Sequence, residues 1–127
     1  RLKRQRNFNT IYEAVKSRTD LFILPEWGSD ADISWFGFPL TIRRSDTELR
    51  SQLLKELNAK GIGTRLLFGG NLTRQPAFLR TPYKLSGSLE NSDKVMKDTF
   101  WVGTFPGITD DMASYIGEVL AGFRDGE

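Results

Sequence analysis

The sequence contains no cysteine and no histidine, and these two absences exclude several classes of function. Without cysteine, the chain forms no disulfide and offers no thiolate to zinc or to an iron–sulfur cluster. Without histidine, it supplies neither a Ser-His-Asp nor a Cys-His catalytic site, and a typical zinc site is excluded as well. Any chemistry carried by this chain would fall to Asp, Glu, Lys, Tyr or Ser.

Long apolar runs are also lacking. No stretch approaches the roughly 20 apolar residues of a membrane span, and no signal-peptide pattern opens the chain. We therefore expect a cytoplasmic protein with no membrane partner. The chain begins with Arg1 inside a helical pattern, and not with Met, which predicts a piece of a longer protein.

The net charge is small and unevenly placed. Its formal value is +2 over 127 residues, and Arg1, Lys3, Arg4 and Arg6 hold much of the basic excess. This is typical of a basic helix end, and the basic residues do not interleave with exposed aromatic side chains. We predict no nucleic-acid partner. The length and the 39% hydrophobic content fit a single domain over residues 1–127.

Hydrophobic periodicity predicts three main helices and three or four short strands. A capping box at Ser45 and Glu48 would begin the middle helix, Gly61 would end it, and Thr109 would cap the last one. Pro39 predicts an edge position or a bulge in its strand, because proline cannot donate to a ladder. The expected helices cover residues 3–18, 45–61 and 109–123; the expected strands cover 21–24, 33–42, 64–68 and 99–102; residues 72–78 would form one helical turn, 80–91 an irregular excursion and 93–97 a short helix. Together they predict an α+β layer, a short, mainly antiparallel sheet with helices packed on one face.

One segment is a candidate binding site: GIGTRLLFGGNLTRQPA, residues 61–77. Its Gly69–Gly70 pair lets the backbone pass close to a ligand or another chain, since neither residue has a Cβ atom. The guanidinium groups of Arg65 and Arg74 suit phosphate or carboxylate oxygens, and the Asn71 amide suits sugar hydroxyls or bases. The alternative is a hairpin or bulge turn with solvated side chains.

A second candidate surface is the aromatic group Trp35, Phe36 and Phe38. Alternation along a strand places Trp35 and Phe36 on opposite faces. One face would be core and the other could wall a pocket; core on both faces is the alternative. The carboxylates and lysines lie in loops or on polar helix faces, where nothing activates them. The sequence therefore favours a contribution to a shared binding site over catalysis by this chain.

Three phrases occur together in this chain: SWFGFPLTI, GIGTRLLFGGNLTRQPA and GSLENSDKVMKDTFWVGTFPGIT. They resemble the C-terminal domain of the DegT/StrS family of sugar aminotransferases and dehydratases, which depend on pyridoxal phosphate (PLP). The resemblance covers nearly the whole chain and is strongest to the members that remove the 3-hydroxyl group from 4-keto-6-deoxy nucleotide sugars. It implies the small C-terminal domain of a fold type I enzyme, normally a homodimer, in deoxysugar synthesis for lipopolysaccharide.

The resemblance also implies where the chemistry lies. In this family the larger N-terminal domain holds the pyridoxal or pyridoxamine phosphate, and in the dehydrases a histidine of that domain replaces the usual Schiff-base lysine. Some 3-dehydrases add an iron–sulfur cluster on cysteines of that larger part. All of this would lie outside the present chain. The chain itself would cap the cleft, complete a pocket for a CDP- or GDP-linked sugar and be inactive alone, with no catalytic, cofactor-binding or metal-binding residue of its own.

The resemblance assigns expected substrate contacts by position. Phe36 falls where aminotransferase members usually have histidine, and the dehydrase type has an aromatic residue there. The stretch from Arg65 to Gln75 matches the part that approaches cofactor and substrate at the domain interface, so Arg65, Asn71 and Arg74 are expected to contact substrate together with Phe36. Two alternatives stay open: the small domain of a sugar aminotransferase, and a stand-alone module that binds a nucleotide or an anion through Arg65, Arg74 and Arg80.

Overall fold

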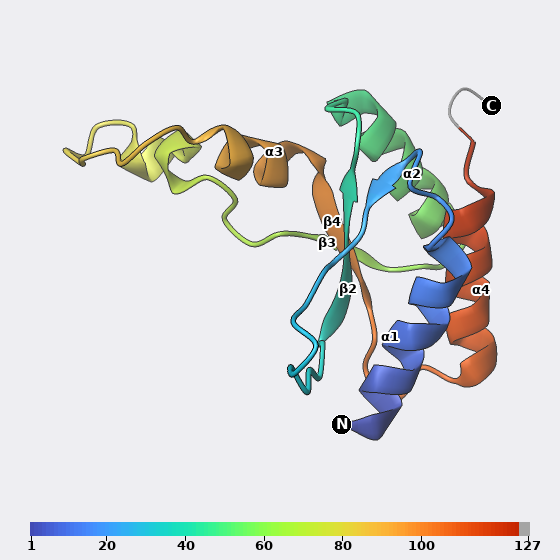
Figure 1. Cartoon of the computed structure of the whole chain (residues 1–127). Helices are drawn as coiled ribbons and strands as arrows, with labels where there is room; N and C mark the ends of the chain where they lie inside the picture. Colours follow the sequence, from blue (N-terminus) through green and yellow to red (C-terminus); the bar gives the residue numbers. More distant parts are fainter. Residues whose placement is uncertain (125–127) are drawn as a thin grey trace.

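The computed structural model describes residues 1–124, which form a sheet with helices on one face and a long arm on the other side (Figure 1). The helices are α1 (Leu2–Val15), α2 (Thr47–Ala59), α3 (Glu90–Asp98) and α4 (Asp110–Gly122), with the short 3₁₀ turns η1 (Leu72–Arg74) and η2 (Pro76–Phe78). The strands are β1 (Phe22–Ile23), β2 (Gly37–Ile42), β3 (Thr64–Leu66) and β4 (Thr99–Gly103). The expected α+β class, with a short antiparallel sheet and helices packed on one face, is confirmed.

The strands lie in the order β1-β2-β4-β3, and every neighbouring pair is antiparallel. The expected edge position of Pro39 is wrong for the strand as a whole, because β2 has neighbours on both sides. Pro39 itself nevertheless has an edge on one side, since β1 pairs only with Thr41 and Ile42 and ends before it reaches Pro39. The short neighbour leaves that side of β2 without a partner strand at Pro39, where a missing N–H costs no ladder hydrogen bond.

Alternation along β2 and β4 decides which face is the core. Phe38, Leu40 and Ile42 of β2 and Phe100 and Val102 of β4 are fully buried against α1, α2 and α4. Burying side chains of this size contributes about 1.5–3 kcal/mol each before entropy is counted. The core therefore lies on the helical side of the sheet, and the residues between these positions face the other way.

The expected strand 33–42 begins only at Gly37. Trp35 lies before it and stacks on Phe8 of α1, with ring centroids 5.3 Å apart, whereas Phe36 points to the opposite face and is 53% exposed. This confirms that Trp35 and Phe36 point apart. The regular alternation breaks at Gly37, because Phe38 joins Trp35 on the core side.

The cap of the middle helix differs from the expected capping box. Asp46, and not Ser45, caps α2, since its carboxylate accepts from the backbone N–H groups of Glu48 and Leu49 at 3.1 Å. Ser45 donates instead to the buried Asp98 at 2.8 Å. The other two end signals are confirmed: Gly61 has a positive φ of 77° after α2, and the Thr109 hydroxyl accepts from Met112 N–H at the start of α4.

Residues 67–98 form the arm, which contains η1, η2 and α3 and extends away from the helical layer (Figure 1). The helical turn expected over 72–78 is two 3₁₀ turns, and the short helix expected over 93–97 is longer at its N-terminus. Within the described part of the chain, none of the helices has the length and apolarity needed to cross a bilayer.

Candidate functional site

The face of the sheet opposite α1, α2 and α4 is the first part of the candidate site. Trp101 lies at its centre, because β4 is flanked by β2 and β3 and Trp101 pairs with Pro39 on one side and Arg65 on the other. Its benzenoid ring covers Gly37, where an added Cβ would lie only 2.3 Å from Cε3. The glycine therefore allows the indole to lie close to the sheet.

Phe36 completes an aromatic cluster on this face. Its ring meets Trp101 edge-on at a centroid distance of 4.9 Å and lies 6.1 Å from the ring of Phe68, the first aromatic residue of the arm. Phe68 is 78% exposed and has a positive φ of 46°, a conformation that is unusual for a side chain of its size. A small apolar cavity of about 100 Å³ lies between these rings. Backbone strain beside an exposed aromatic cluster is a feature often found at functional sites.

Arg65 lies on the same face as Trp101, because paired residues of antiparallel strands share a face. Its side chain is exposed, and its one hydrogen bond in the described chain runs from Nη1 to the Thr64 carbonyl at 3.1 Å. No carboxylate of residues 1–124 pairs with this guanidinium. Arg65 thus keeps its charge available to an anionic oxygen.

The structure brings Asn71 and Arg74 together in the arm, at Asp93 of α3. The Asp93 carboxylate accepts from Asn71 Nδ2 at 2.8 Å and from Arg74 Nε and Nη2 at 3.1 and 2.7 Å. The hydrogen bonds from Arg74 and then from Asn71 lower the pKa of Asp93 to about 2. The same ion pair raises the pKa of Arg74. This network braces the arm internally.

Asn71 is only 3% exposed, and its side chain is used by the protein itself. Its Oδ1 accepts from the backbone N–H and the hydroxyl of Thr73, at 3.1 and 2.7 Å, and so caps η1. Arg74 differs, because its side chain is 60% exposed and Nη1 has no hydrogen-bond partner within residues 1–124. Of the expected contact residues, Phe36, Arg65 and Arg74 therefore present surface to a ligand.

Gly70 explains why the arm turns where it does. Its φ is +59°, and an added Cβ would lie 2.5 Å from Met96 Cγ of α3. The expected close approach at the glycine pair is thus made by the chain's own helix. The arm folds back on itself here, and this return places Asp93 beside Arg74.

The base of the arm is fixed to the sheet by Lys94. Its ammonium group donates to the carbonyls of Ile42 and Arg43 at 3.0 and 3.1 Å and pairs with the fully buried Asp98 at 2.9 Å. The buried Asp98 carboxylate in particular would be costly to leave without a partner. Lys94 is therefore a structural residue and not an available amine.

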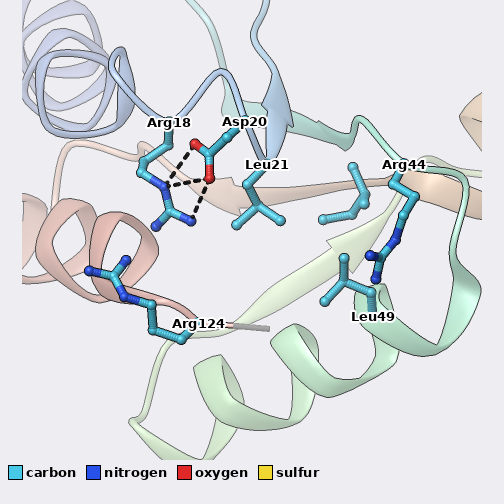
Figure 2. A pocket seen from close by; sticks show the side chains of 7 residues that line it. Arg18, Asp20, Leu21, Arg44, Leu49 and Arg124 are labelled. Atoms are coloured by element: carbon cyan, nitrogen blue, oxygen red, sulfur yellow. Dashed lines mark hydrogen bonds and ion pairs between the residues drawn. The ribbon is translucent and has the colours of Figure 1, made fainter. Parts of the chain in front are cut away.

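Another pocket, of about 320 Å³, lies away from these residues, between the β1 end of the sheet and the ends of α2 and α4 (Figure 2). Arg18, Arg44 and Arg124 line it above an apolar floor. Arg18 pairs with Asp20 and also donates to carbonyls at the end of α4, and Arg44 pairs with Asp46 at 3.0 Å. Because two of its three guanidinium groups are paired within the chain, this pocket has little free charge for a ligand.

No group of three carboxylates within residues 1–124 is placed to hold a metal ion. The arrangement offers an aromatic wall, one free guanidinium and a braced arm, which can bind and orient a ligand and exclude water from it.

A scan against family models finds the DegT/DnrJ/EryC1/StrS aminotransferase family over residues 1–121. The chain belongs to this family. The match spans the sheet, the arm and all but the last residue of α4.

Two curated relatives of this family domain are similar over most of the chain. Lipopolysaccharide biosynthesis protein RfbH of Salmonella typhimurium is 42% identical over 90% of the chain, and a dTDP-4-dehydro-2,6-dideoxy-D-glucose 3-dehydratase of Saccharopolyspora spinosa is 45% identical over 94%. The chain spans about a quarter of their length, 26% in each case. The crystal structure of Escherichia coli GDP-4-keto-6-deoxy-D-mannose-3-dehydratase with bound hydrated PLP matches 93% of the chain with a TM-score of 0.80 and 25% identity, and the match covers 30% of that structure.

Sequence reasoning did not assign a role to three residues that shape this site. Asp93 falls in the expected helix 93–97 and Trp101 in the expected strand 99–102, and neither expectation gives the residue a partner. Phe68 was placed at the end of a strand. The register of β3 against β4 and the return of the arm along α3 bring them to Arg65 and Arg74. Such contacts between distant segments leave no local pattern in the sequence.

Proposed function

We propose that this chain is the small capping domain of a PLP-dependent nucleotide-sugar 3-dehydratase that removes the 3-hydroxyl group of a 4-keto-6-deoxy sugar. The observation that carries the proposal is the similarity, over almost the whole chain, to a lipopolysaccharide biosynthesis protein and to a 3-dehydratase. The aromatic face supports it, because exposed rings such as Phe36 and Phe68 favour a partner surface. We place the enzyme in cytoplasmic deoxysugar synthesis for lipopolysaccharide.

The cofactor would be held by another part of the enzyme. A relative of known structure carries bound hydrated PLP, and we propose that the present chain does not hold this group. Lys94, the one half-buried lysine of residues 1–124, donates its ammonium hydrogens to backbone carbonyls and to Asp98. We propose that the N-terminal domain of the homodimeric parent enzyme holds the cofactor and any iron–sulfur cluster, since this chain has no cysteine.

This chain would contribute position and shielding. Phe36, Trp101 and Phe68 would face the N-terminal domain and exclude water from the reacting sugar. Arg65, whose charge is unpaired in the described chain, would contact a phosphate oxygen of the nucleotide sugar. Asn71 would act through the arm, because its amide is buried and bonded to Asp93 and Thr73.

The test is product analysis with the full-length enzyme. Purified protein loaded with PLP is given CDP-, GDP- and dTDP-linked 4-keto-6-deoxy sugars, and mass spectrometry follows the sugar. We expect loss of the 3-hydroxyl group from at least one of them. A stable 4-amino sugar as the product would contradict the proposal. The present chain alone should show no turnover, and turnover by it would also contradict the proposal.

The second candidate is a sugar aminotransferase, which the family description itself favours. Phe36 is the discriminating position, and Phe36→His is the variant. If the aromatic residue favours dehydration, this variant should gain transamination in the full-length enzyme. Phe105→His is the matched control, because Phe105 is similarly exposed at 56% but lies in the turn before α4. Equal products from wild type and both variants would remove Phe36 as a determinant.

Titration of the present chain with nucleotide sugars distinguishes a stand-alone nucleotide-binding module from a capping domain. Tight binding of CDP- or GDP-sugars to the present chain, without any other domain, would favour the module over the capping domain. The capping reading expects weak binding, because Arg65 and the aromatic face form only one side of a pocket.

A further inference from the structure

The arm contains a cavity that the proposed function does not yet use. It has a volume of about 340 Å³, within the range of small-ligand pockets, and it lies between η1 and the start of α3. The lining residues are Thr73, Arg74, Tyr83, Leu85, Gly87, Ser88, Leu89, Glu90 and Asp93. They offer hydroxyl groups, one aromatic ring and two leucine side chains around a single guanidinium group.

The charges of the lining decide which kind of ligand fits. Asp93 holds Arg74 through two nitrogens, so the two charges offset each other. Glu90 is exposed at the same cavity and adds a negative charge. A phosphate group would therefore meet a lining without net positive charge, which disfavours it. An uncharged polar ring meets no such penalty.

Arg74 still has one donor edge to offer. Asp93 occupies Nε and Nη2, while Nη1 has no partner within residues 1–124. A guanidinium group fixed on one edge loses little further side-chain entropy when it donates from the other. Tyr83, which is 53% exposed, provides a ring on which a planar base can stack. These features match a nucleobase with carbonyl acceptors better than a saturated sugar.

We propose that the arm cavity binds the uncharged nucleoside end of the nucleotide sugar. Tyr83 stacks on the base, Arg74 Nη1 donates to a base oxygen, and Asp93 is the positioning residue that aims Arg74. The inference rests on the proposed function, since it assigns two parts of one nucleotide-sugar substrate to two different arginines. Arg65, which has no carboxylate partner in the described chain, takes the phosphates, and the neutralised Arg74 takes the nucleoside.

The experiment is a nuclear magnetic resonance titration of the present chain with free cytidine, thymidine and guanosine, followed by amide shifts of residues 73–93. We expect saturable shifts with at least one nucleoside. Free 6-deoxyhexose is the comparison, and saturable shifts with that sugar but not with any nucleoside would overturn the inference. The absence of saturable shifts with all three nucleosides would overturn it as well.

Variants assign the contacts. Arg74→Gln and Tyr83→Leu should each weaken nucleoside binding about fivefold or more, the loss expected for one hydrogen bond or one stacked ring. Asp93→Asn should weaken binding in wild-type background but have no added effect in the Arg74→Gln background, because Asp93 acts through Arg74. If Asp93→Asn weakens nucleoside binding by the same factor in the Arg74→Gln background as in wild type, Asp93 does not act through Arg74 and the positioning role is overturned. Asp111→Asn is the matched control, an exposed acidic residue in the first turn of α4 as Asp93 is in the first turn of α3.

Failure of this inference and failure of the proposed function give different results. If full-length enzyme dehydrates a nucleotide sugar while the titration shows no nucleoside shifts, only the arm cavity assignment is wrong. If nucleosides bind in the arm but no 4-keto-6-deoxy sugar loses its 3-hydroxyl group, the binding site stands and the reaction is wrong. Fold integrity of each variant is checked by the unchanged amide shifts of β2 and β4.

Discussion

Phe36 lies edge-on against Trp101, with ring centroids 4.9 Å apart and ring planes at 70°, on the sheet face opposite the core. The pair exists because Gly37 lets the indole lie close to the backbone of β2. Edge-to-face pairs contribute about 0.5–1.5 kcal/mol beyond the area they bury. The aromatic face is thus preformed in the domain before any partner covers it.

Gly37→Ala tests this arrangement. The new Cβ would lie 2.3 Å from Cε3 of Trp101, so the indole must move and the Phe36 contact is lost. We expect a destabilisation of about 1–3 kcal/mol in urea unfolding, with a changed tryptophan emission maximum. Gly28→Ala is the control, because nothing lies within 4 Å of its Cβ position. Unchanged emission in Gly37→Ala would show that the ring does not cover the glycine.

Gly70→Ala tests the fold of the arm. The substitution forces alanine into a positive φ of 59° and places its Cβ 2.5 Å from Met96 Cγ. We expect a loss of about 2 kcal/mol, from backbone strain together with the displaced methionine. Amide hydrogen exchange in residues 70–98 should accelerate more than in the sheet. Gly63→Ala, whose Cβ meets nothing within 4 Å, should leave exchange in the arm as in wild type.

Lys94→Met tests the base of the arm. The substitution keeps the apolar stem but removes the donor to Ile42 and Arg43 and leaves the buried Asp98 with Ser45 alone. We expect a loss of about 2–4 kcal/mol, somewhat less than for a fully buried pair because the Lys94 side chain is 28% exposed. The double variant Lys94→Met with Asp98→Asn should recover part of it. No recovery would mean that the carbonyl contacts, and not the charge pair, dominate.

Acid should loosen the arm through Asp93. Its pKa is lowered to about 2 by Arg74 and Asn71, so the brace contributes stability above the ordinary carboxyl pKa of 3.8. That contribution is lost as the pH falls from about 4 toward 2. Exchange rates in residues 70–74, corrected for intrinsic pH dependence, should rise across this window. In Asp93→Asn the rates should already be high at pH 5, and a remaining acid step in that variant would point to another group.

The present chain should self-associate at high concentration. Large apolar side chains of the arm are exposed, among them Phe68 at 78% and Leu79 at 66%, and the aromatic face adds Phe36. Exposed apolar surface of this extent favours association. Light scattering should show a mass that grows with concentration, and Phe68→Ser should reduce the growth. A constant monomer mass at high concentration would contradict the expectation that this surface needs a partner.

The sequence by itself determined the main elements and two of the three expected helix-end signals, whereas the cap of α2 is Asp46 and not Ser45. The apolar spacing of α1, α2 and α4 is local information, and Gly61 and Thr109 act within their own turns. The aromatic strand and the glycine segment were also recognisable as candidate surfaces, since they depend on residue type and order. The family resemblance followed from the same local phrases, and the family itself is confirmed.

Only the tertiary structure decided what the candidate residues do. In the sequence Asn71 and Arg74 look equivalent, since both are polar residues after a glycine pair. Both bond to Asp93, which lies 19 or more residues later in the chain. Asn71 is buried, whereas Arg74 keeps Nη1 without a partner in the described chain. Arg65 keeps its charge because its register partner is Trp101 and not a carboxylate. The physical reason is that charge pairing and burial depend on which distant segments meet, and strand register and the return of the arm set those meetings.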